Sequence, residues 1–140
     1  MKTLSTAEEI NQRFANTLVS ALGIEITAIH EQAVHGRMPV DKRTIQAHGS
    51  LHGGASVAFA ETLGSVGANL QVNYPDEYCV GAEINANHLT SVNSGWVHGV
   101  ATPLKIGKRL QVWDIQIKND HNELVCVSRL TVAIIPKKAL

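Results

Sequence analysis

The sequence predicts an α+β protein in which one long helix packs against a six-stranded antiparallel sheet. Residues 55–70 are apolar or small on nearly every side of a helix, which is typical of a buried helix. Four strand-like segments follow at 78–90, 96–104, 109–118 and 124–135. Their connections are short, and short connections join antiparallel neighbours, because a parallel crossover needs about a dozen residues. One helix with an antiparallel sheet is an α+β arrangement.

The first part of the chain is predicted to supply an N-terminal helix and two further strands. Residues 6–22 are predicted to form one helix, because Thr6 and Glu9 have the spacing of a capping box. Alternating apolar residues predict strands at 24–29 and 34–40. The apolar stripe of the helix recurs every four residues, at Ile10, Phe14, Leu18 and Leu22.

The remaining connections follow from residue types with known turn preferences. Residues 41–50 lack apolar periodicity and are expected to be a loop that leads to the long helix. The pair Gly53-Gly54 is expected to form a tight turn before that helix. Residues 73–77 contain Asn, Pro and Asp and predict a second turn. Residues 136–140 are expected to be a frayed tail, so that residues 1–140 form a single domain.

Composition excludes some functions and favours a cytoplasmic protein. The formal net charge of the 140 residues is zero, so no electrostatic argument favours nucleic acid or an anionic membrane as a partner. No apolar run approaches the roughly 20 residues that span a bilayer, and Met1–Asn16 does not resemble a secretory signal. Cys79 and Cys126 lack metal-site or redox spacing, which favours buried thiols in a reducing compartment.

The start and the middle of the long helix carry the residue types of a reactive site. The backbone N–H groups at Gly53 and Gly54 form an electropositive helix start, which attracts negative charge. His52 precedes them. Two turns later Glu61 lies in an apolar helix, and a carboxylate removed from water is more basic than one in water. Ser65 lies one turn beyond Glu61, on the same helix face.

Three segments closely resemble the PaaI-type hotdog-fold acyl-CoA thioesterases. They are 46–56 (QAHGSLHGGAS), 60–65 (AETLGS) and 81–88 (GAEINANH). The resemblance spans about 23–135 and is nearest to the bacterial branch that hydrolyses aroyl-CoA thioesters, such as 1,4-dihydroxy-2-naphthoyl-CoA and 4-hydroxybenzoyl-CoA. It implies a long helix wrapped by an antiparallel sheet. It also implies a homodimer, often paired into a homotetramer, with active sites between two subunits.

The resemblance also implies a role for individual residues. Glu61 would act as nucleophile or as general base on the thioester, and the backbone N–H of Gly53 would polarise the thioester carbonyl. Gln46 and His52 would position the thioester, and Ser65 would orient the hydrolytic water. In this family the helix carboxylate of one subunit faces the glycine turn of its partner. The substrate is an acyl-CoA, so coenzyme A is part of the substrate and no separate cofactor is expected.

The remaining assignments concern coenzyme A. The resemblance places His88 in its binding region, and Gly54 belongs to the same substrate-binding helix start. The family has an Arg two residues after the His88 position, where this sequence has Thr90. Phosphate contacts are therefore assigned to three cations of a predicted hairpin. They are Lys105, Lys108 and Arg109.

Each assignment has a structural alternative. His52 can cap the helix, Ser65 can bond to a helix carbonyl, and His88 can be a hydrogen-bonded part of the scaffold. Gln46 can serve the loop, and a cationic hairpin tip can simply be solvated. His48 and His52 have no third ligand nearby in the sequence, so no metal site is expected. The family usually has Pro-Phe where Ala47-His48 stands, which bears on the acyl pocket.

The predicted function is hydrolysis of an acyl-CoA, preferably aromatic, to a free acid and coenzyme A. Two alternatives stay open. One is a thioesterase that proofreads acyl carrier proteins. The other is an acyl-CoA binding module without catalysis, in which replacing Glu61 would leave the function intact.

Overall fold

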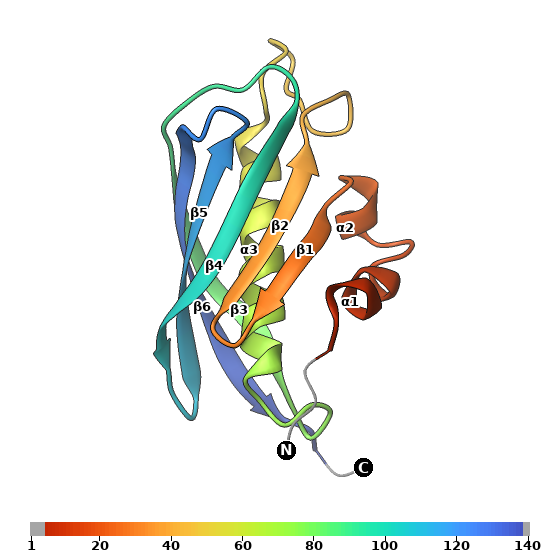
Figure 1. The fold of residues 1–140 in the computed structure, drawn as a ribbon. Helices are drawn as coiled ribbons and strands as arrows, with labels where there is room; N and C mark the ends of the chain where they lie inside the picture. Colours follow the sequence, from red (N-terminus) through yellow and green to blue (C-terminus); the bar gives the residue numbers. More distant parts are fainter. Residues whose placement is uncertain (1–4, 139–140) are drawn as a thin grey trace.

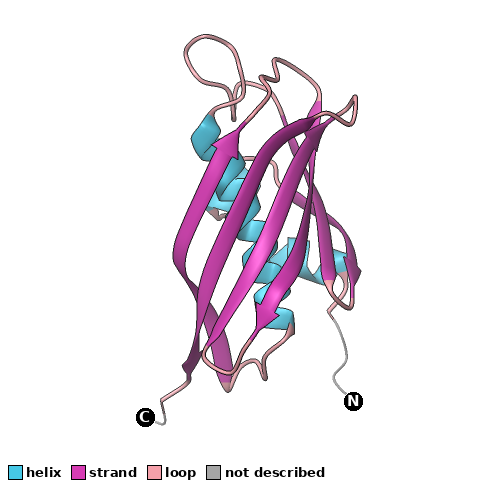
Figure 2. Ribbon diagram, turned by 90° about the vertical axis from the view of Figure 1, so that its left-hand side faces the viewer, coloured by secondary structure: helices cyan, strands magenta, loops and turns pink. Residues whose placement is uncertain are grey.

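The central element of the structure, a computed structural model that describes residues 5–138, is the helix α3 (Gly53–Leu70). It runs across one side of a single curved sheet, and the strands cover that side of the helix along its length (Figures 1 and 2). The predicted α+β arrangement of one long helix and a six-stranded antiparallel sheet is confirmed. None of the helices within residues 5–138 has the length and hydropathy needed to cross a membrane.

The sheet orders its strands β1-β2-β4-β5-β6-β3, with every neighbouring pair antiparallel. All six lie within two residues of their predicted bounds. β6 continues through Pro136, and the N–H of Lys137 donates to the carbonyl of Asp76 over 2.8 Å. The predicted frayed tail is therefore wrong at these two residues, and 139–140 lie outside the described part. The strands are β1 (Glu25–His30), β2 (Ala33–Pro39), β3 (Glu77–His88), β4 (Trp96–Ile106), β5 (Leu110–Asn119) and β6 (Leu124–Pro136).

The N-terminal helix predicted over 6–22 is two helices, α1 (Ala7–Arg13) and α2 (Leu18–Ala21). Thr6 caps α1 as predicted, accepting a hydrogen bond from the N–H of Glu9 over 3.1 Å. Helix α1 ends at Arg13, and the chain then turns at Asn16, whose φ of 62° lies in the left-handed region. Asn adopts that conformation more readily than most residues. The apolar stripe from Ile10 to Leu22 therefore spans two short helices and the turn between them, not one continuous helix.

Close packing between α3 and the sheet depends on glycines on both sides. Phe59 and Leu63 of α3 pack onto Gly36 of β2 and onto Gly99 of β4, where a Cβ would meet them. In the opposite direction, Leu130 packs onto Gly64 and Trp113 packs onto Gly67. These side chains are buried. This packing of side chains onto glycines fixes the distance and rotation of α3 relative to the sheet. It therefore also determines which face of α3 is left for other contacts.

The two edges of the sheet differ in what covers them. Asn11 of α1 bonds both backbone groups of Ile26 in β1, accepting from its N–H over 2.8 Å and donating to its carbonyl over 2.9 Å. At the opposite edge, β3 pairs with β6 alone among the described strands, and most of its twelve residues are exposed. A long uncovered edge strand is a ready surface for pairing with another strand.

Candidate active site

His52 and the two glycines after it form the first turn of α3. The glycines were predicted to make a turn before the helix, but α3 begins at Gly53 and His52 is its N-cap. Nδ1 of His52 accepts a hydrogen bond from the N–H of Gly54 over 2.7 Å. When the ring is neutral, its proton therefore lies on Nε2. The imidazole is therefore the N-cap hydrogen-bond acceptor, a role that a Ser or Asp side chain usually has at a helix start.

The cap leaves one backbone donor at this helix start without a partner. The N–H of Gly54 bonds to the His52 ring, and those of Ala55 and Ser56 bond to the His52 carbonyl. The N–H of Gly53 makes no hydrogen bond to any other residue within 5–138. A free donor at a helix N-terminus is suited to an anionic oxygen.

His88 lies against this donor. A Cβ built on Gly53 would lie 2.9 Å from Nε2 of His88, at the end of β3. A Cβ on Gly54 would similarly lie 2.9 Å from Nδ1 of His52. A side chain at either glycine would therefore displace the imidazole that borders it. The structure brings together four of the predicted residues, His52, Gly53, Gly54 and His88, at one end of α3.

Glu61 and Ser65 lie on a second face of α3. The sequence suggested burial all round the helix, but in the single chain one stripe is half-buried and borders a pocket of about 860 Å³. Among the described residues neither the Glu61 carboxylate nor the Ser65 hydroxyl has a hydrogen-bond partner. Ser65 does not bond back to a helix carbonyl, whereas Thr62 does, to Ala58 over 2.7 Å. The stripe is Ala58, Glu61, Thr62, Ser65, Val66 and Asn69.

The carboxylate of Glu61 lies against the backbone of β3 at Gly81. A Cβ at Gly81 would overlap Oε2 of Glu61. The φ of Gly81 is not in the left-handed region, so no backbone conformation demands glycine here. The missing side chain makes the space that Glu61 occupies. Sequence reasoning did not single out Gly81, because its role depends on α3 and β3 lying side by side.

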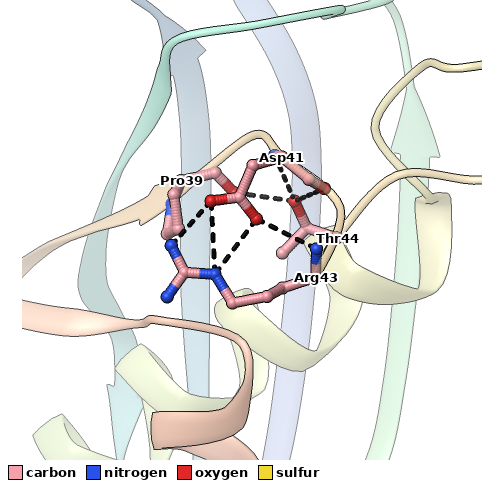
Figure 3. Close-up of polar contacts among 4 residues, drawn as sticks. All are labelled: Pro39, Asp41, Arg43 and Thr44. Carbon is pink, nitrogen blue, oxygen red and sulfur yellow. Dashed lines mark hydrogen bonds and ion pairs between the residues drawn. The ribbon is translucent and has the colours of Figure 1, made fainter.

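Gln46 lies in a loop that the ion pair between Asp41 and Arg43 stabilises. Asp41 and Arg43 form a bidentate contact, with Nη2 of Arg43 to Oδ2 of Asp41 at 2.6 Å (Figure 3). Hydrogen bonds from the Arg43 side chain and backbone lower the pKa of Asp41 to about 2. Thr44 is buried and donates to the carbonyl of Pro39 over 2.7 Å. These contacts hold the loop against the end of β2.

The side chain of Gln46 is itself engaged in the loop. Its Oε1 accepts a hydrogen bond from the N–H of His48. Its backbone N–H donates to the carbonyl of Ser50 over 2.8 Å, and its carbonyl accepts from Gly49 over 2.9 Å. The side-chain amide nitrogen of Gln46, Nε2, has no hydrogen-bond partner among the described residues. It is the part of Gln46 that can meet a substrate.

The three predicted phosphate-binding cations lie away from this helix start. Lys105 is on β4, and Lys108 and Arg109 are in the β4–β5 connection. All three are exposed. In Figure 1 the β4–β5 connection is at the lower end of the molecule, whereas α3 begins at the upper end. Within one chain the structure does not bring these cations to Gly53 or His88.

Gly53 and Glu61 are also too far apart to act together within one chain. Eight residues separate them along α3, which at 1.5 Å per residue is about 12 Å. A donor that stabilises a developing oxyanion must lie about 3 Å from it. Each chain therefore carries two separate groups, a backbone donor without a partner at the helix start and a carboxylate beside the pocket, which we call half-sites.

The pocket beside Glu61 is walled mainly by apolar side chains. Its volume lies within the range of about 300–1,000 Å³ that holds small-molecule ligands. Arg13 of α1 also lines it. Sequence reasoning did not single out Arg13, although its position three residues after Ile10 and next to Phe14 places it on the apolar stripe. The wall contributed by the N-terminal helices includes Ile10, Phe14, Leu18, Val19 and Leu22.

Comparison with known proteins identifies the family of this chain. Residues 48–126 match the thioesterase superfamily. A thioesterase structure from Haemophilus influenzae superposes with a TM-score of 0.93 at 49% identity, covering 96% of this chain and 94% of that one. The 1,4-dihydroxy-2-naphthoyl-CoA hydrolase of Escherichia coli K12 is 45% identical, over 93% of this chain and 95% of that protein. The proofreading thioesterase EntH of Cronobacter turicensis is 45% identical, over 92% and 93%.

Proposed function

This chain belongs to the thioesterase superfamily and has its hotdog fold, and from that premise we propose that its substrates are acyl-CoA thioesters with an aromatic acyl group. A hydroxyaroyl group, as in 1,4-dihydroxy-2-naphthoyl-CoA or 4-hydroxybenzoyl-CoA, is the preferred candidate. The products are the free acid and coenzyme A. The observation that carries the proposal is Glu61, a carboxylate without a protein partner among residues 5–138, beside a mainly apolar pocket.

Thioester hydrolysis has two steps, and both half-sites would act in the first. In the first, an oxygen nucleophile adds to the carbonyl carbon and negative charge develops on the carbonyl oxygen, where the N–H of Gly53 would donate. Loss of one such donor typically slows a reaction about 100- to 1,000-fold. In the second, the C–S bond breaks and coenzyme A leaves as a thiol, with a proton returned by the Glu61 carboxyl group if Glu61 acts as general base, or taken from water if Glu61 acts as nucleophile.

The nucleophile can be formed in two ways, and Glu61 serves in both. Its carboxylate can attack directly, giving an anhydride that water then hydrolyses, or it can take a proton from an attacking water. Ser65 lies one turn away with a free hydroxyl, in place to orient that water. His52 and Gln46 would hold the thioester, and His88 would contact coenzyme A. The reaction as proposed needs no cofactor or metal, and we place it in the cytoplasm.

A second copy of the chain would unite the half-sites. β3 runs alongside α3 in the opposite direction, so that Gly81 lies beside Glu61 and His88 beside Gly53. A two-fold axis that brings the helix start of one subunit to Glu61 of the other must therefore pass midway between Gly81 and His88, near Ile84. The uncovered edge of β3 would then pair with its copy, which is the isologous contact that a two-fold axis produces. Further pairing of dimers would give the proposed homotetramer.

The support for an aromatic acyl group comes from the pocket and the relatives. The pocket is lined by Phe14, Tyr74 and Tyr78 together with aliphatic side chains, and flat rings pack well against such walls. Among the relatives, one is named for a bicyclic aroyl-CoA. Another is named as a proofreading thioesterase, which supports an acyl carrier protein as the alternative carrier of the thioester.

The test is a panel of thioesters followed with a thiol-detecting reagent. Benzoyl-, hydroxybenzoyl-, phenylacetyl-, butyryl- and palmitoyl-CoA are compared at equal concentration, together with a hydroxybenzoyl group on an acyl carrier protein. We expect the aroyl-CoA compounds to have the highest kcat/KM, and Glu61→Gln to lower kcat by at least about 100-fold without loss of folding. Faster release from the carrier protein would favour the proofreading function. Tight binding without thiol release, unaffected by Glu61→Gln, would contradict catalysis.

A further inference from the structure

The pocket beside Glu61 contains one positive charge that the hydrolytic mechanism does not use. Among the described residues that line it, Glu61 and Arg13 are the charged ones. Glu61 lies on α3 at the proposed reaction centre, and Arg13 lies on α1. The rest of the lining is apolar apart from uncharged hydroxyl, thiol and amide groups.

The rotation of α1 brings Arg13 to this pocket. Asn11 is bonded to both backbone groups of Ile26, which fixes one side of α1 on β1. Residues three and four positions apart share a helix face, so Ile10, Arg13 and Phe14 turn toward the same place. All three line the pocket. Arg13 therefore lines the pocket while it remains exposed to solvent.

Arg13 has no charged partner within the fold. Its guanidinium makes no ion pair or hydrogen bond with another residue of 5–138, although Glu9 lies one turn earlier on the same helix. An exposed arginine that braces the structure would be expected to hold a carboxylate or a carbonyl, as Arg43 holds Asp41. The five N–H donors of Arg13 are instead available to a ligand in the pocket.

We propose that Arg13 recognises an anionic oxygen group, such as a carboxylate or an ionised phenol, at the end of the acyl group that is remote from the thioester. This inference rests on the proposed function. The planar guanidinium matches a carboxylate in geometry as well as charge. Hydrogen bonds between ionised partners are about twice as strong as neutral ones. The pocket would then select acyl groups by their remote substituent.

The experiment compares matched pairs of substrates that differ in that substituent alone. One pair is 4-carboxybenzoyl-CoA and 4-methylbenzoyl-CoA. A longer pair, 6-carboxy-2-naphthoyl-CoA and 6-methyl-2-naphthoyl-CoA, extends the reach toward Arg13. The measured quantity is the ratio of kcat/KM for the acidic and the neutral member of each pair, in the wild type and in Arg13→Met, Arg13→Lys and Arg129→Met. Arg129 is an exposed arginine of β6 outside the pocket and serves as the matched control.

We expect Arg13→Met to lower that ratio about tenfold in at least one pair, mainly through KM, and Arg13→Lys to keep part of it. The neutral substrates and Arg129→Met should behave as the wild type does. Equal ratios in the wild type and Arg13→Met, for both pairs, would overturn the role of Arg13 while leaving thioester hydrolysis intact. Absence of thiol release from every compound would overturn the proposed function, and this inference with it.

Discussion

Glu61 is positioned by a residue that has no side chain. Gly81 of β3 leaves the space in which the Glu61 carboxylate lies, and that carboxylate makes no hydrogen bond within residues 5–138 that would otherwise fix its rotamer. The restraint on the proposed catalytic group is therefore steric. A small change at Gly81 should displace Glu61 without disturbing the core, because the end of a long side chain can move while the backbone stays.

Replacing Gly81 with alanine should lower kcat and leave the protein folded. The added Cβ would push the Glu61 carboxylate from its place, and a displacement of about 1 Å can cost up to about 100-fold in rate. We expect at least a tenfold loss in kcat with an unchanged thermal unfolding midpoint. The loss is measured by thiol release from benzoyl-CoA and the midpoint by circular dichroism.

A double-mutant cycle separates this contact from a general weakening of the site. Glu61→Asp shortens the side chain and removes the overlap with a Cβ at position 81. The double variant should therefore be no slower than Glu61→Asp alone, since residues in contact have non-additive effects. Losses that add in the double variant would show that Gly81 acts by another route.

Asp41 gives a prediction about pH. Its bonds to Arg43 lower its pKa to about 2, from an ordinary value of 3.8. The stability that the charged carboxylate contributes is therefore complete above pH 4 and is lost as the pH falls from about 4 to about 2. The gap in unfolding free energy between the wild type and Asp41→Asn should be constant from pH 7 to pH 5 and narrow below pH 4. A gap that stays the same down to pH 3 would contradict the role of this pair.

At the scale of single elements, His52 caps α3, and we propose that it also contacts the substrate. Nδ1 caps the helix, whereas Nε2 has no hydrogen-bond partner among the described residues. The alternative that His52 is a cap is therefore confirmed, and its proposed contact with substrate is compatible with it, because the two tasks use different ring nitrogens. Substitutions can separate them.

His52→Asn should keep the cap and lose the second task. Asn is among the best N-cap residues, whereas Ala at this position costs about 1 kcal/mol of stability. We expect His52→Ala to be less stable than His52→Asn in urea unfolding, and both variants to lose at least about tenfold in kcat/KM. Full activity of His52→Asn would mean that the residue serves the helix alone.

The sequence predicted the strands closely and the helices less well. Alternation marks a strand because every second residue of 110–119 or 124–136 meets the core. The break between α1 and α2 left the apolar spacing intact, so the stripe from Ile10 to Leu22 did not reveal it. The start of α3 was misjudged because His52 is an unusual cap and glycine usually marks the end of helical structure.

The candidate site was predictable where one short segment carries it. The residues at the start of α3 and the pair Glu61–Ser65 are neighbours in sequence as well as in space, so spacing and resemblance identified them. Gly81 and Arg13 come to the site only through the packing of β3 and α1 on α3. No local pattern marks such residues, because the sequence of one strand or helix does not show which side chains of another element will pack against it.

At the scale of the whole molecule, the two half-sites of the described chain lie apart. The free N–H of Gly53 and the carboxylate of Glu61 are about 12 Å apart along α3. The edge of β1 is covered by α1, whereas β3 is an uncovered edge of twelve residues along which both half-sites lie. The account therefore predicts a dimer through β3, with each active site shared by two subunits.

Complementation between two inactive variants tests this central claim most directly. Glu61→Gln and His52→Asn are mixed in equal amounts, unfolded together and refolded, so that about half of the dimers contain one subunit of each kind. In a shared arrangement each mixed dimer has one site with both residues intact, and thiol release should recover to about a quarter of the wild-type rate. Activity that stays at the average of the two separately refolded variants would contradict a site built from two chains.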